Sequence, residues 1–334
     1  MSKIVVVTGA SAGVGRATVR EFAAHGYDVA LLARHRGRLE TAAEECRAFG
    51  VRALPLCVDV ADSAAVENAA EQIEQVLGPI DVWVNIAMAT AFSEFEHLTA
   101  EEFKRGTEVT YLGQVYGVMA ALRRMRRRNR GTLINVGSAL AHRAIPLQSV
   151  YCGAKFAVRG FTESLRSELI HDRLNVHVCT VDLPALNTPQ FDWALNKTGW
   201  QSRPVAPVFE PELAARAIYF ASQHRRRAIY VGTSTVKAML ANLLLPGLLD
   251  HYLAHSGYAG QMTRRRQAPD APANLFATVD GTQGARGRFE AEAIHGQVAT
   301  FSDRYRAAAW WGVGIGLWLA WRMLRDRRPT STQH

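Results

Sequence analysis

The chain has 334 residues, of which 48% are hydrophobic, enough to bury a large core; one α/β domain of about 250 residues would leave about 80 over. Its formal net charge of +9 could attract anionic lipid head groups. Runs of arginine are also expected at the carboxyl ends of helices, where cations are favoured. The sequence does not interleave basic and aromatic residues in the way typical of nucleic-acid binding. The four cysteines and the histidines lack metal-ligand spacing, so we assign no metal and expect reduced thiols.

The first predicted strand, Lys3–Thr8, is a β-branched run that begins almost at the first residue. No secretory signal precedes it, so we expect the folded domain to stay in the cytoplasm. The strand leads into Gly9-Ala-Ser-Ala-Gly13-Val-Gly15 and a helix-like segment, 14–25. Glycines at such a turn let the backbone bend tightly and approach a pyrophosphate, which then lies at the positive end of the helix dipole. Alone the turn is weak evidence, since its spacing is not G-x-G-x-x-G.

Strand and helix patterns alternate along the following 230 residues. This alternation predicts a Rossmann-type, doubly wound parallel sheet of about seven strands, with helices on both faces and ligands bound beyond the carboxyl ends of the strands. Gly9, Asn85, Ser138 and Pro184 all fall at such ends, so one cleft is expected to collect them. The predicted strands are 3–8, 28–33, 51–58, 81–86, 131–137, 175–181 and 228–231.

The end of the second strand bears on the choice of nucleotide. It reads Leu31-Leu-Ala-Arg34-His-Arg36-Gly-Arg38, with no acid before Glu40. An NAD site places a carboxylate there for the ribose 2′-hydroxyl, whereas a 2′-phosphate favours arginine. NADP is therefore favoured over NAD, with Arg34 as the phosphate ligand. Arg36 and Arg38 are expected on the exposed start of the next helix.

Three residues in the second half of the predicted sheet have the chemistry of a proton-transfer site. Tyr151 and Lys155 are four positions apart on a predicted helix and so share one face, and Ser138 lies thirteen positions upstream. A neighbouring cation stabilises a phenolate and moves its pKa toward a range where protons exchange at neutral pH. The serine hydroxyl can hold the reacting oxygen. By itself the Tyr-x-x-x-Lys pair would be an exposed ring beside an exposed charge.

Taken together, these residues resemble the short-chain dehydrogenase/reductase family, in its classical single-domain type, over residues 3–232. The motifs that carry the resemblance are Thr8-Gly9 with Gly13 and Gly15, Asp59-Val60, Asn85-Ile-Ala, Ser138, Tyr151 with Lys155, and Leu183-Pro184 followed by Thr188. The resemblance implies that Tyr151 is the proton donor or acceptor, Lys155 the ribose ligand and Ser138 the partner of the substrate oxygen. It also implies cofactor contacts from Gly9, Ser11, Gly13, Val14, Gly15, Arg34, Asp59, Val60, Asn85, Tyr151, Lys155, Pro184 and Thr188.

The chain departs from the family pattern at several positions. Ile86 and Met88 place larger apolar groups after the fourth strand, and Ala185 replaces a glycine after the sixth. Many relatives have asparagine at the position of Thr110 and use its backbone to hold a water in a proton relay to the lysine. A backbone role tolerates substitution, so Thr110 is retained as a candidate catalytic residue.

The sequence predicts that the chain is organised in three parts. Residues 1–255 form the Rossmann catalytic domain, 256–303 a loop-rich linker or extension, and 304–334 a hydrophobic helix with basic flanks. The uncharged run 307–321, extended to 324, gives about 27 Å of helix at ~1.5 Å per residue, against ~30 Å of hydrocarbon. Four tryptophans and a G-x-x-x-G suit membrane attachment through 307–324. A buried amphipathic or domain-capping helix is the alternative.

These features predict an NADP(H)-dependent oxidoreductase that transfers hydride between nicotinamide and a carbonyl or secondary alcohol. Reduction is the favoured direction, on a small-molecule substrate. The apolar segments 186–200 and 239–249 suggest a lipophilic substrate, although both could equally be core or dimer surface. We expect a homo-oligomer and no nucleic-acid partner. The alternative is a catalytically silent NADP-binding sensor or membrane-associated scaffold with the same fold.

Overall fold

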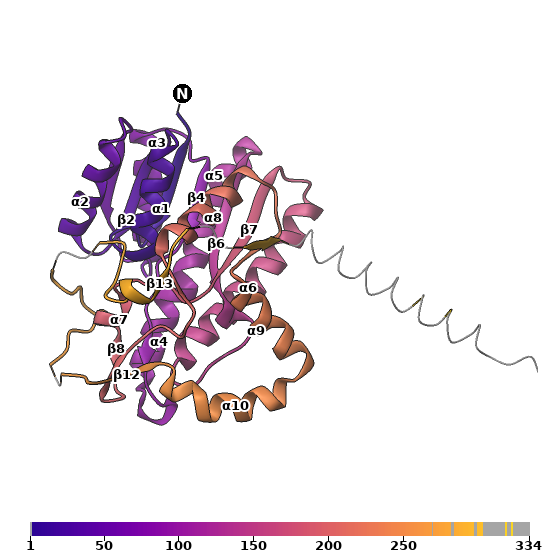
Figure 1. Ribbon diagram of the computed structural model, residues 1–334. Helices are drawn as coiled ribbons and strands as arrows, with labels where there is room; N and C mark the ends of the chain where they lie inside the picture. The colour runs from indigo at the N-terminus through magenta and orange to yellow at the C-terminus, as the bar shows by residue number, and fades with distance from the viewer. Residues whose placement is uncertain are drawn as a thin grey trace, which may run out of the picture.

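The computed structural model describes residues 2–268, 270–281, 284–296 and 299–302, together with Trp318 and Arg322. Its centre is an eight-stranded sheet of which seven neighbouring strands are parallel, and these are the seven predicted from the sequence (Figure 1). The eighth strand was not predicted and runs antiparallel at one edge. In sheet order the strands are β14 (Thr300–Ser302), β11 (Ala228–Val231), β7 (Val176–Leu183), β6 (Gly131–Ser138), β4 (Val82–Asn85), β1 (Ile4–Thr8), β2 (Asp28–Ala33) and β3 (Ala53–Cys57).

Helices cover both faces of the sheet, as the strand–helix alternation predicts. One face carries α1 (Gly13–Ala24), α2 (Arg36–Arg47) and α8 (Pro211–Gln223), and the other carries α3 (Ser63–Val76), α5 (Gly113–Arg128) and α6 (Ser149–His171). The β1 side chains show how the sequence specifies this arrangement. Val5 and Val7 belong to the first apolar core, whereas Ile4 and Val6 belong to the second, because successive side chains of a strand point to opposite faces.

The region after β11 packs onto the domain rather than leaving it. Helices α9 (Thr233–Leu244) and α10 (Pro246–Ala259) are followed by β12 (Met262–Arg266), which pairs with β9 (Trp200–Ser202). Further along, β13 (Ala293–Ile294) pairs with β10 (Val208–Phe209), and β14 completes the central sheet. The expected boundary at residue 255 therefore falls inside α10. The remaining elements are α4 (Ala100–Thr107), α7 (Gln190–Trp193), β5 (Ala91–Phe92), β8 (Leu195–Asn196), a π-helical turn at Glu108–Leu112 and 3₁₀ turns at Phe95–His97, Ala139–Ala141 and Glu290–Glu292.

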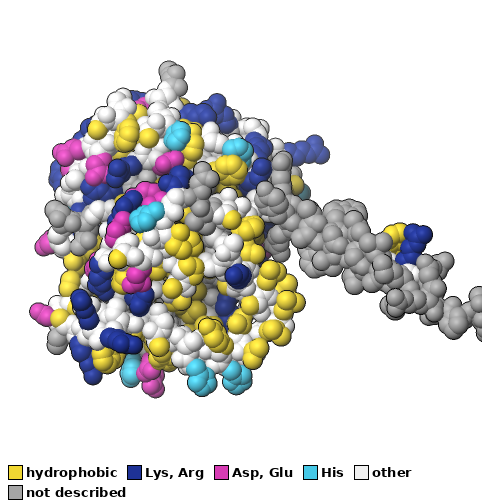
Figure 2. All heavy atoms as spheres, in the orientation of Figure 1, with side chains coloured by type: hydrophobic (Ala, Val, Ile, Leu, Met, Phe, Trp, Pro, Cys, Tyr) yellow, Lys and Arg dark blue, Asp and Glu magenta, His cyan; other side chains and the backbone are white. Residues whose placement is uncertain are grey.

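Hydrophobic side chains gather on the surface of α9 and α10 (Figure 2). Leu243, Leu244 and Leu248 are between 64% and 71% exposed, so they are not part of the core. Within the described residues, no helix has the length and apolarity needed to span a bilayer. The predicted hydrophobic helix at 307–324 lies outside the described residues apart from Trp318 and Arg322.

A buried polar network holds the middle of the sheet to two helices. The Asn85 amide donates to Asn135 Oδ1 at 2.9 Å, and the Asn135 amide donates to Thr162 Oγ1 of α6 at 2.9 Å. On the other side, Trp83 Nε1 donates to Asn85 Oδ1 at 2.8 Å. Gly117 of α5 packs directly over this last bond. A Cβ atom there would lie 2.2 Å from Asn85 Oδ1 and 2.6 Å from Trp83 Nε1.

We therefore expect Gly117→Ala to lower the free energy of unfolding by about 2 kcal/mol, since the methyl group must displace a fully buried hydrogen bond. The matched control is Gly160→Ala on α6, where a Cβ would meet no atom within 4 Å; alanine there should add up to about 1 kcal/mol. Urea denaturation of both variants measures the difference. Equal shifts in the same direction would contradict the packing argument.

Candidate active site

The turn between β1 and α1 has a backbone that side chains would obstruct. Gly9 and Gly13 have φ angles of +72° and +55°, which glycine adopts without strain. At Gly15, a Cβ atom would lie 2.0 Å from the carbonyl oxygen of Gly9. The turn is bonded to the segment that follows β4 through Thr8, whose Oγ1 accepts hydrogen bonds from the backbone amides of Ile86 and Ala87 at 3.0 and 3.1 Å. The three predicted glycines thus shape one tight cradle.

Helix α1 starts in this cradle without a side-chain cap. Its N-cap residue is Ala12, which has no side-chain acceptor for the backbone amides of the first turn. Uncapped amides at a helix start, with the positive end of the dipole behind them, form an anion-binding site. One of these amides, Gly13 N, donates to the carbonyl of Gly284 at 3.2 Å. An anion at this amide would replace that hydrogen bond.

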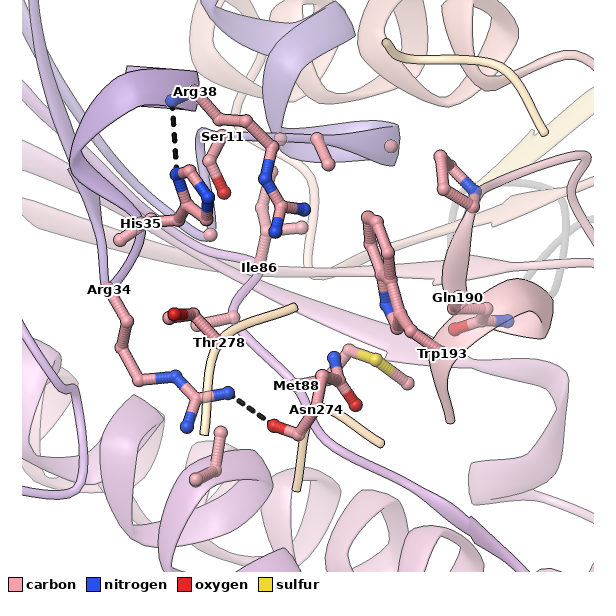
Figure 3. A pocket seen from close by; sticks show the side chains of 18 of the residues that line it. Ser11, Arg34, His35, Arg38, Ile86, Met88, Gln190, Trp193, Asn274 and Thr278 are labelled. Carbon is pink, nitrogen blue, oxygen red and sulfur yellow. Dashed lines mark hydrogen bonds between the residues drawn. The ribbon is translucent and has the colours of Figure 1, made fainter. Parts of the chain in front are cut away.

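A cavity of about 190 Å³ opens beside the turn (Figure 3). The residues that line it come from the carboxyl ends of strands and from the C-terminal region. Among the predicted cofactor residues, the lining includes Gly9, Ser11, Gly13, Val14, Gly15, Arg34, Asp59, Val60 and Thr188. The sheet therefore brings these together from four segments of the chain. Asn274, Thr278 and Val279 form a wall that the sequence did not indicate.

Arg34, the predicted phosphate ligand, lies at the end of β2 and contacts this wall. Its guanidinium donates to the carbonyl of Phe276 at 3.1 Å, to that of Leu275 at 3.5 Å and to that of Asn274 (Figure 3). Burial lowers its pKa, and the Asp59 carboxylate opposes that change. A half-buried cation thus lines the cavity, held by backbone oxygens of the chain itself.

Arg38 differs from its expected position on an exposed helix start. Arg36 is exposed, but only 7% of Arg38 is exposed. Its guanidinium lies 4.7 Å from the ring centroid of Trp193 and donates to the carbonyl of Val279. Its Nε has no hydrogen-bond partner among the described residues. Arg38 is the basic cavity residue that the sequence analysis missed, because Trp193 and Val279 cover it from distant parts of the chain.

Asp59 and Val60 follow β3 and occupy different environments. Asp59 Oδ2 accepts from Arg105 at 2.5 Å, and its Oδ1 accepts from the amide of Ala61 at 3.0 Å. Although burial raises the pKa of the Asp59 carboxyl, these bonds outweigh it and the pKa falls below its usual value. Val60 is 5% exposed and packs against Gly113.

Ser138, Tyr151 and Lys155 meet at the carboxyl end of β6. Ser138 is the last residue of that strand, and its side chain hydrogen-bonds Tyr151. Lys155 is 2% exposed; its Nζ donates to the carbonyl of Val136 at 2.7 Å and lies 5.5 Å from the Tyr151 ring centroid. The helical spacing therefore places phenol and ammonium together, with the serine hydroxyl beside the phenol.

Burial dominates the ionisation of this group. It raises the pKa of Tyr151 to about 12, against the opposing hydrogen bond from Ser138. It also lowers the pKa of Lys155 to about 8, against the opposing charge of Asp182. The sequence predicts that the neighbouring lysine moves the pKa of the phenol toward the neutral range. In the structure that pKa moves the other way, because desolvation of the phenolate is the largest effect.

Two predicted residues have side chains that serve the scaffold. Thr110 is fully buried in the π-helical turn, where its Oγ1 accepts from the amide of Ala89 at 2.9 Å and donates to its carbonyl at 2.7 Å. Asn85 is fully buried in the polar network described above and does not line the cavity. Neither side chain is free to contact a ligand. Pro184 also lies outside the cavity lining, as do Ser138, Tyr151 and Lys155.

Comparison with known proteins decides the family. The model for short chain dehydrogenases matches residues 3–196. The chain belongs to the short-chain dehydrogenase family. Family relatives include the uncharacterized oxidoreductase YxnA of Bacillus subtilis (strain 168), 33% identical over 278 residues, which cover 82% of this chain and 78% of that protein. Membership makes the chain an oxidoreductase of the type that acts on CH–OH groups with a nicotinamide cofactor.

Two further family members are informative. The 3-dehydrosphinganine reductase of Danio rerio is 35% identical over 192 residues, 56% of this chain and 57% of the relative. An alcohol dehydrogenase from the archaeon Thermococcus sibiricus, solved with 5-hydroxy-NADP, superposes with a TM-score of 0.59 at 28% identity, covering 69% of this chain and 96% of that one. The fold shared with that structure thus extends over about two thirds of this chain.

The buried ammonium has a testable consequence for stability. Because the pKa of Lys155 is lower folded than unfolded, the unfolded chain binds more protons between pH 8 and 10.5, so stability rises with pH there. Below pH 8 the full cost of burying the charge, on the order of 3 kcal/mol, is present. We expect Lys155→Met, without cofactor, to be more stable than the parent by about 2 kcal/mol at pH 7, after the lost hydrogen bond is deducted.

Urea denaturation at pH 7, 8, 9 and 10 measures this difference. The advantage of Lys155→Met should narrow as pH rises from 8 to 10, because the parent lysine then becomes neutral in the folded state. Lys237→Met on α9 is the control for loss of a lysine. A variant that is less stable than the parent at every pH would contradict the expected cost of burial.

Proposed function

We propose that the protein transfers hydride between NADP(H) and a carbonyl or secondary alcohol carbon, with Tyr151 as general acid or base and reduction as the physiological direction. The observation that carries this proposal is the cluster at the end of β6. Ser138 bonds the Tyr151 phenol, and the Lys155 ammonium lies 5.5 Å from its ring centroid. These three groups are sufficient to hold an oxygen and to exchange its proton.

Each residue has a role that follows from its position. The Ser138 hydroxyl donates a hydrogen bond to the substrate oxygen, an interaction worth a few kcal/mol in comparable sites. Tyr151 carries its proton at neutral pH because burial raises its pKa to about 12, which suits proton donation to an alkoxide. Lys155 stabilises the phenolate left behind. Nicotinamide, when bound, supplies or accepts the hydride. Thr110 would contribute through its backbone, since its side chain is occupied.

The residues around the cavity fit a dinucleotide with a 2′-phosphate. The glycine cradle and the uncapped start of α1 suit a pyrophosphate. Arg34 and Arg38 line the cavity, and a buried guanidinium nitrogen without a partner, such as Arg38 Nε, favours an anion nearby. The family neighbour solved with 5-hydroxy-NADP supports the same choice. We therefore favour NADP over NAD for this chain.

A second cavity has room for a substrate with an apolar part and a polar end. It has a volume of about 990 Å³, and its lining combines apolar residues such as Leu147, Trp200 and Met262 with a larger number of charged and polar ones. Leu147 lies on the loop that joins Ser138 to Tyr151, so this cavity adjoins the loop that carries the catalytic residues. One relative is named as a reductase of 3-dehydrosphinganine. The charged residues of the cavity, among them Lys197 and Arg203, would hold a polar end of the substrate.

Three predictions about the setting of the enzyme belong to the same proposal. We propose a catalytic domain in the cytoplasm, a homo-oligomer, and membrane attachment through residues 307–324. The uncharged run and tryptophans of that segment support the attachment.

The mechanism predicts that Tyr151→Phe loses at least about a thousandfold in kcat for carbonyl reduction, because the proton donor is removed while binding is retained. NADPH oxidation across a panel of apolar ketones and aldehydes measures it, with Tyr219→Phe on α8 as control. Turnover equal to that of the parent would rule out the assigned role. NADPH binding by the parent without turnover on any substrate would instead favour the silent sensor.

If Arg34 binds the 2′-phosphate of NADP(H), reversing its charge should weaken the binding of NADPH more than that of NADH. Arg34→Asp should raise the Kd for NADPH by about tenfold or more, because a carboxylate repels the 2′-phosphate, and should change the Kd for NADH far less. Arg36→Asp makes the same change at an exposed position. Fluorescence titration with both nucleotides gives the ratio. An equal loss of NADPH and NADH affinity would mean that Arg34 does not read the 2′-phosphate.

A further inference from the structure

A chain of three polar side chains lies behind the catalytic cluster. Asp182 of β7 is 4% exposed, and its Oδ2 lies 2.8 Å from His142 Nε2. His142, 7% exposed, follows the 3₁₀ turn after β6, and its Nδ1 lies 3.0 Å from a guanidinium nitrogen of Arg159 on α6. Hydrogen bonds thus link the buried carboxylate to His142 and, through His142, to α6.

The arginine determines the direction of these hydrogen bonds. A guanidinium can only donate, so His142 Nδ1 must be the acceptor. The ring proton of the neutral imidazole is then on Nε2, where it donates to Asp182. An ionised carboxylate that accepts from imidazole is consistent with both bonds. The chain therefore runs from the Arg159 cation through a neutral histidine to the Asp182 anion.

The carboxylate lies on the same side of the sheet as Lys155 and Tyr151. Asn135 reaches Thr162 of α6, and Gly137, two residues further along β6, faces the same side. Asp182 is the register partner of Gly137, and a Cβ atom on Gly137 would lie 1.9 Å from Asp182 Oδ1. Only glycine at 137 leaves room for this carboxylate. The Lys155 ammonium bonds the carbonyl of Val136, the preceding residue of the same strand.

The field of Asp182 acts on both catalytic groups in the same direction. It raises the pKa of Lys155 against the effect of burial, and it raises the pKa of Tyr151 in addition to burial. A negative charge therefore keeps the lysine charged and the tyrosine protonated. The titratable and charged groups that pack here are Tyr151, Cys152, Lys155 and Arg159 of α6, His142, Asp182, and Tyr230 of β11, whose ring centroid is 5.8 Å from that of His142.

We propose that Asp182, held by His142 and Arg159, is a positioning residue that serves as the buried counter-ion of Lys155 and keeps Tyr151 in its acid form. Its role in turnover rests on the proposed function, whereas its electrostatic effect on Lys155 does not. The carboxylate contacts neither substrate nor cofactor in this role, and it acts only through the two catalytic side chains.

The primary test follows the charge of Lys155 without turnover. The sequence contains five lysines, Lys3, Lys104, Lys155, Lys197 and Lys237, so lysine labelled with ¹³C at Cε gives few signals, and Lys155→Met identifies the buried one. We expect Asp182→Asn, with or without bound NADPH, to lower the titration midpoint of Lys155 by about one pH unit. Asparagine still accepts the His142 hydrogen bond, so the change removes charge and preserves shape.

The control is Glu168→Gln, which removes a negative charge from the exposed side of α6, the helix that carries Lys155. It should leave the titration midpoint of Lys155 unchanged. Asp182→Ser is the second neutral variant, for use if the asparagine does not fold, and must give the same displacement. A Lys155 midpoint in these variants equal to that of the parent overturns the proposal.

The kinetic readout separates this inference from the proposed function. In carbonyl reduction, the alkaline limb of the kcat/KM profile should move to lower pH in Asp182→Asn, because both Lys155 and Tyr151 lose protons more readily. A uniform loss of activity with an unmoved limb would indicate a merely structural aspartate. A parent protein with no turnover but a displaced Lys155 midpoint would refute the function and leave the counter-ion assignment standing.

Discussion

Lys155 is only 2% exposed, and its ammonium group donates a hydrogen bond to the backbone carbonyl of Val136. A buried cation is costly unless it is bonded and its charge is balanced. The residues at this end of the sheet reduce the cost without removing it, since the pKa of Lys155 is still lowered to about 8. Thr162 and Asn135 bond α6 to β6, which fixes the lysine over its carbonyl. Gly137 leaves room for the Asp182 carboxylate on the same side.

The cavity beside the β1–α1 turn also contains cations whose charge must be balanced, namely Arg34 and Arg38. Arg38 is buried and Arg34 half-buried, and each donates to backbone carbonyls between residues 274 and 279. The region after α10 is thus part of the site as well as of the sheet. Since carbonyl oxygens carry partial charges, they satisfy a guanidinium less completely than a phosphate does. An anion that entered here would compete with these carbonyls.

The sequence predicted the parts of the fold that depend on local pattern. The β-branched runs specify the seven parallel strands, and the glycine spacing specifies the turn after β1. The position of Lys155 beside the Tyr151 ring follows from helical periodicity. Features built from distant segments were out of reach. Strand β14 has three residues and forms only by pairing with β11. Arg38 is buried by Trp193, 155 positions away, and the Asn85 amide is turned into the core by Trp83 and Asn135.

Asp182 and Gly137 show why the site could not be completed from motifs. Each is unremarkable in the sequence, because an aspartate before Leu183-Pro184 and a glycine before Ser138 carry no signal alone. Register makes them partners, since β6 and β7 pair Gly137 with Asp182. The missing side chain at one position then accommodates the carboxylate of the other. An ionised group enters the interior only where a neighbour gives it space and a donor, and His142 supplies that donor. The surroundings of Tyr151 and Lys155 therefore include pairs of residues that only the folded sheet brings together.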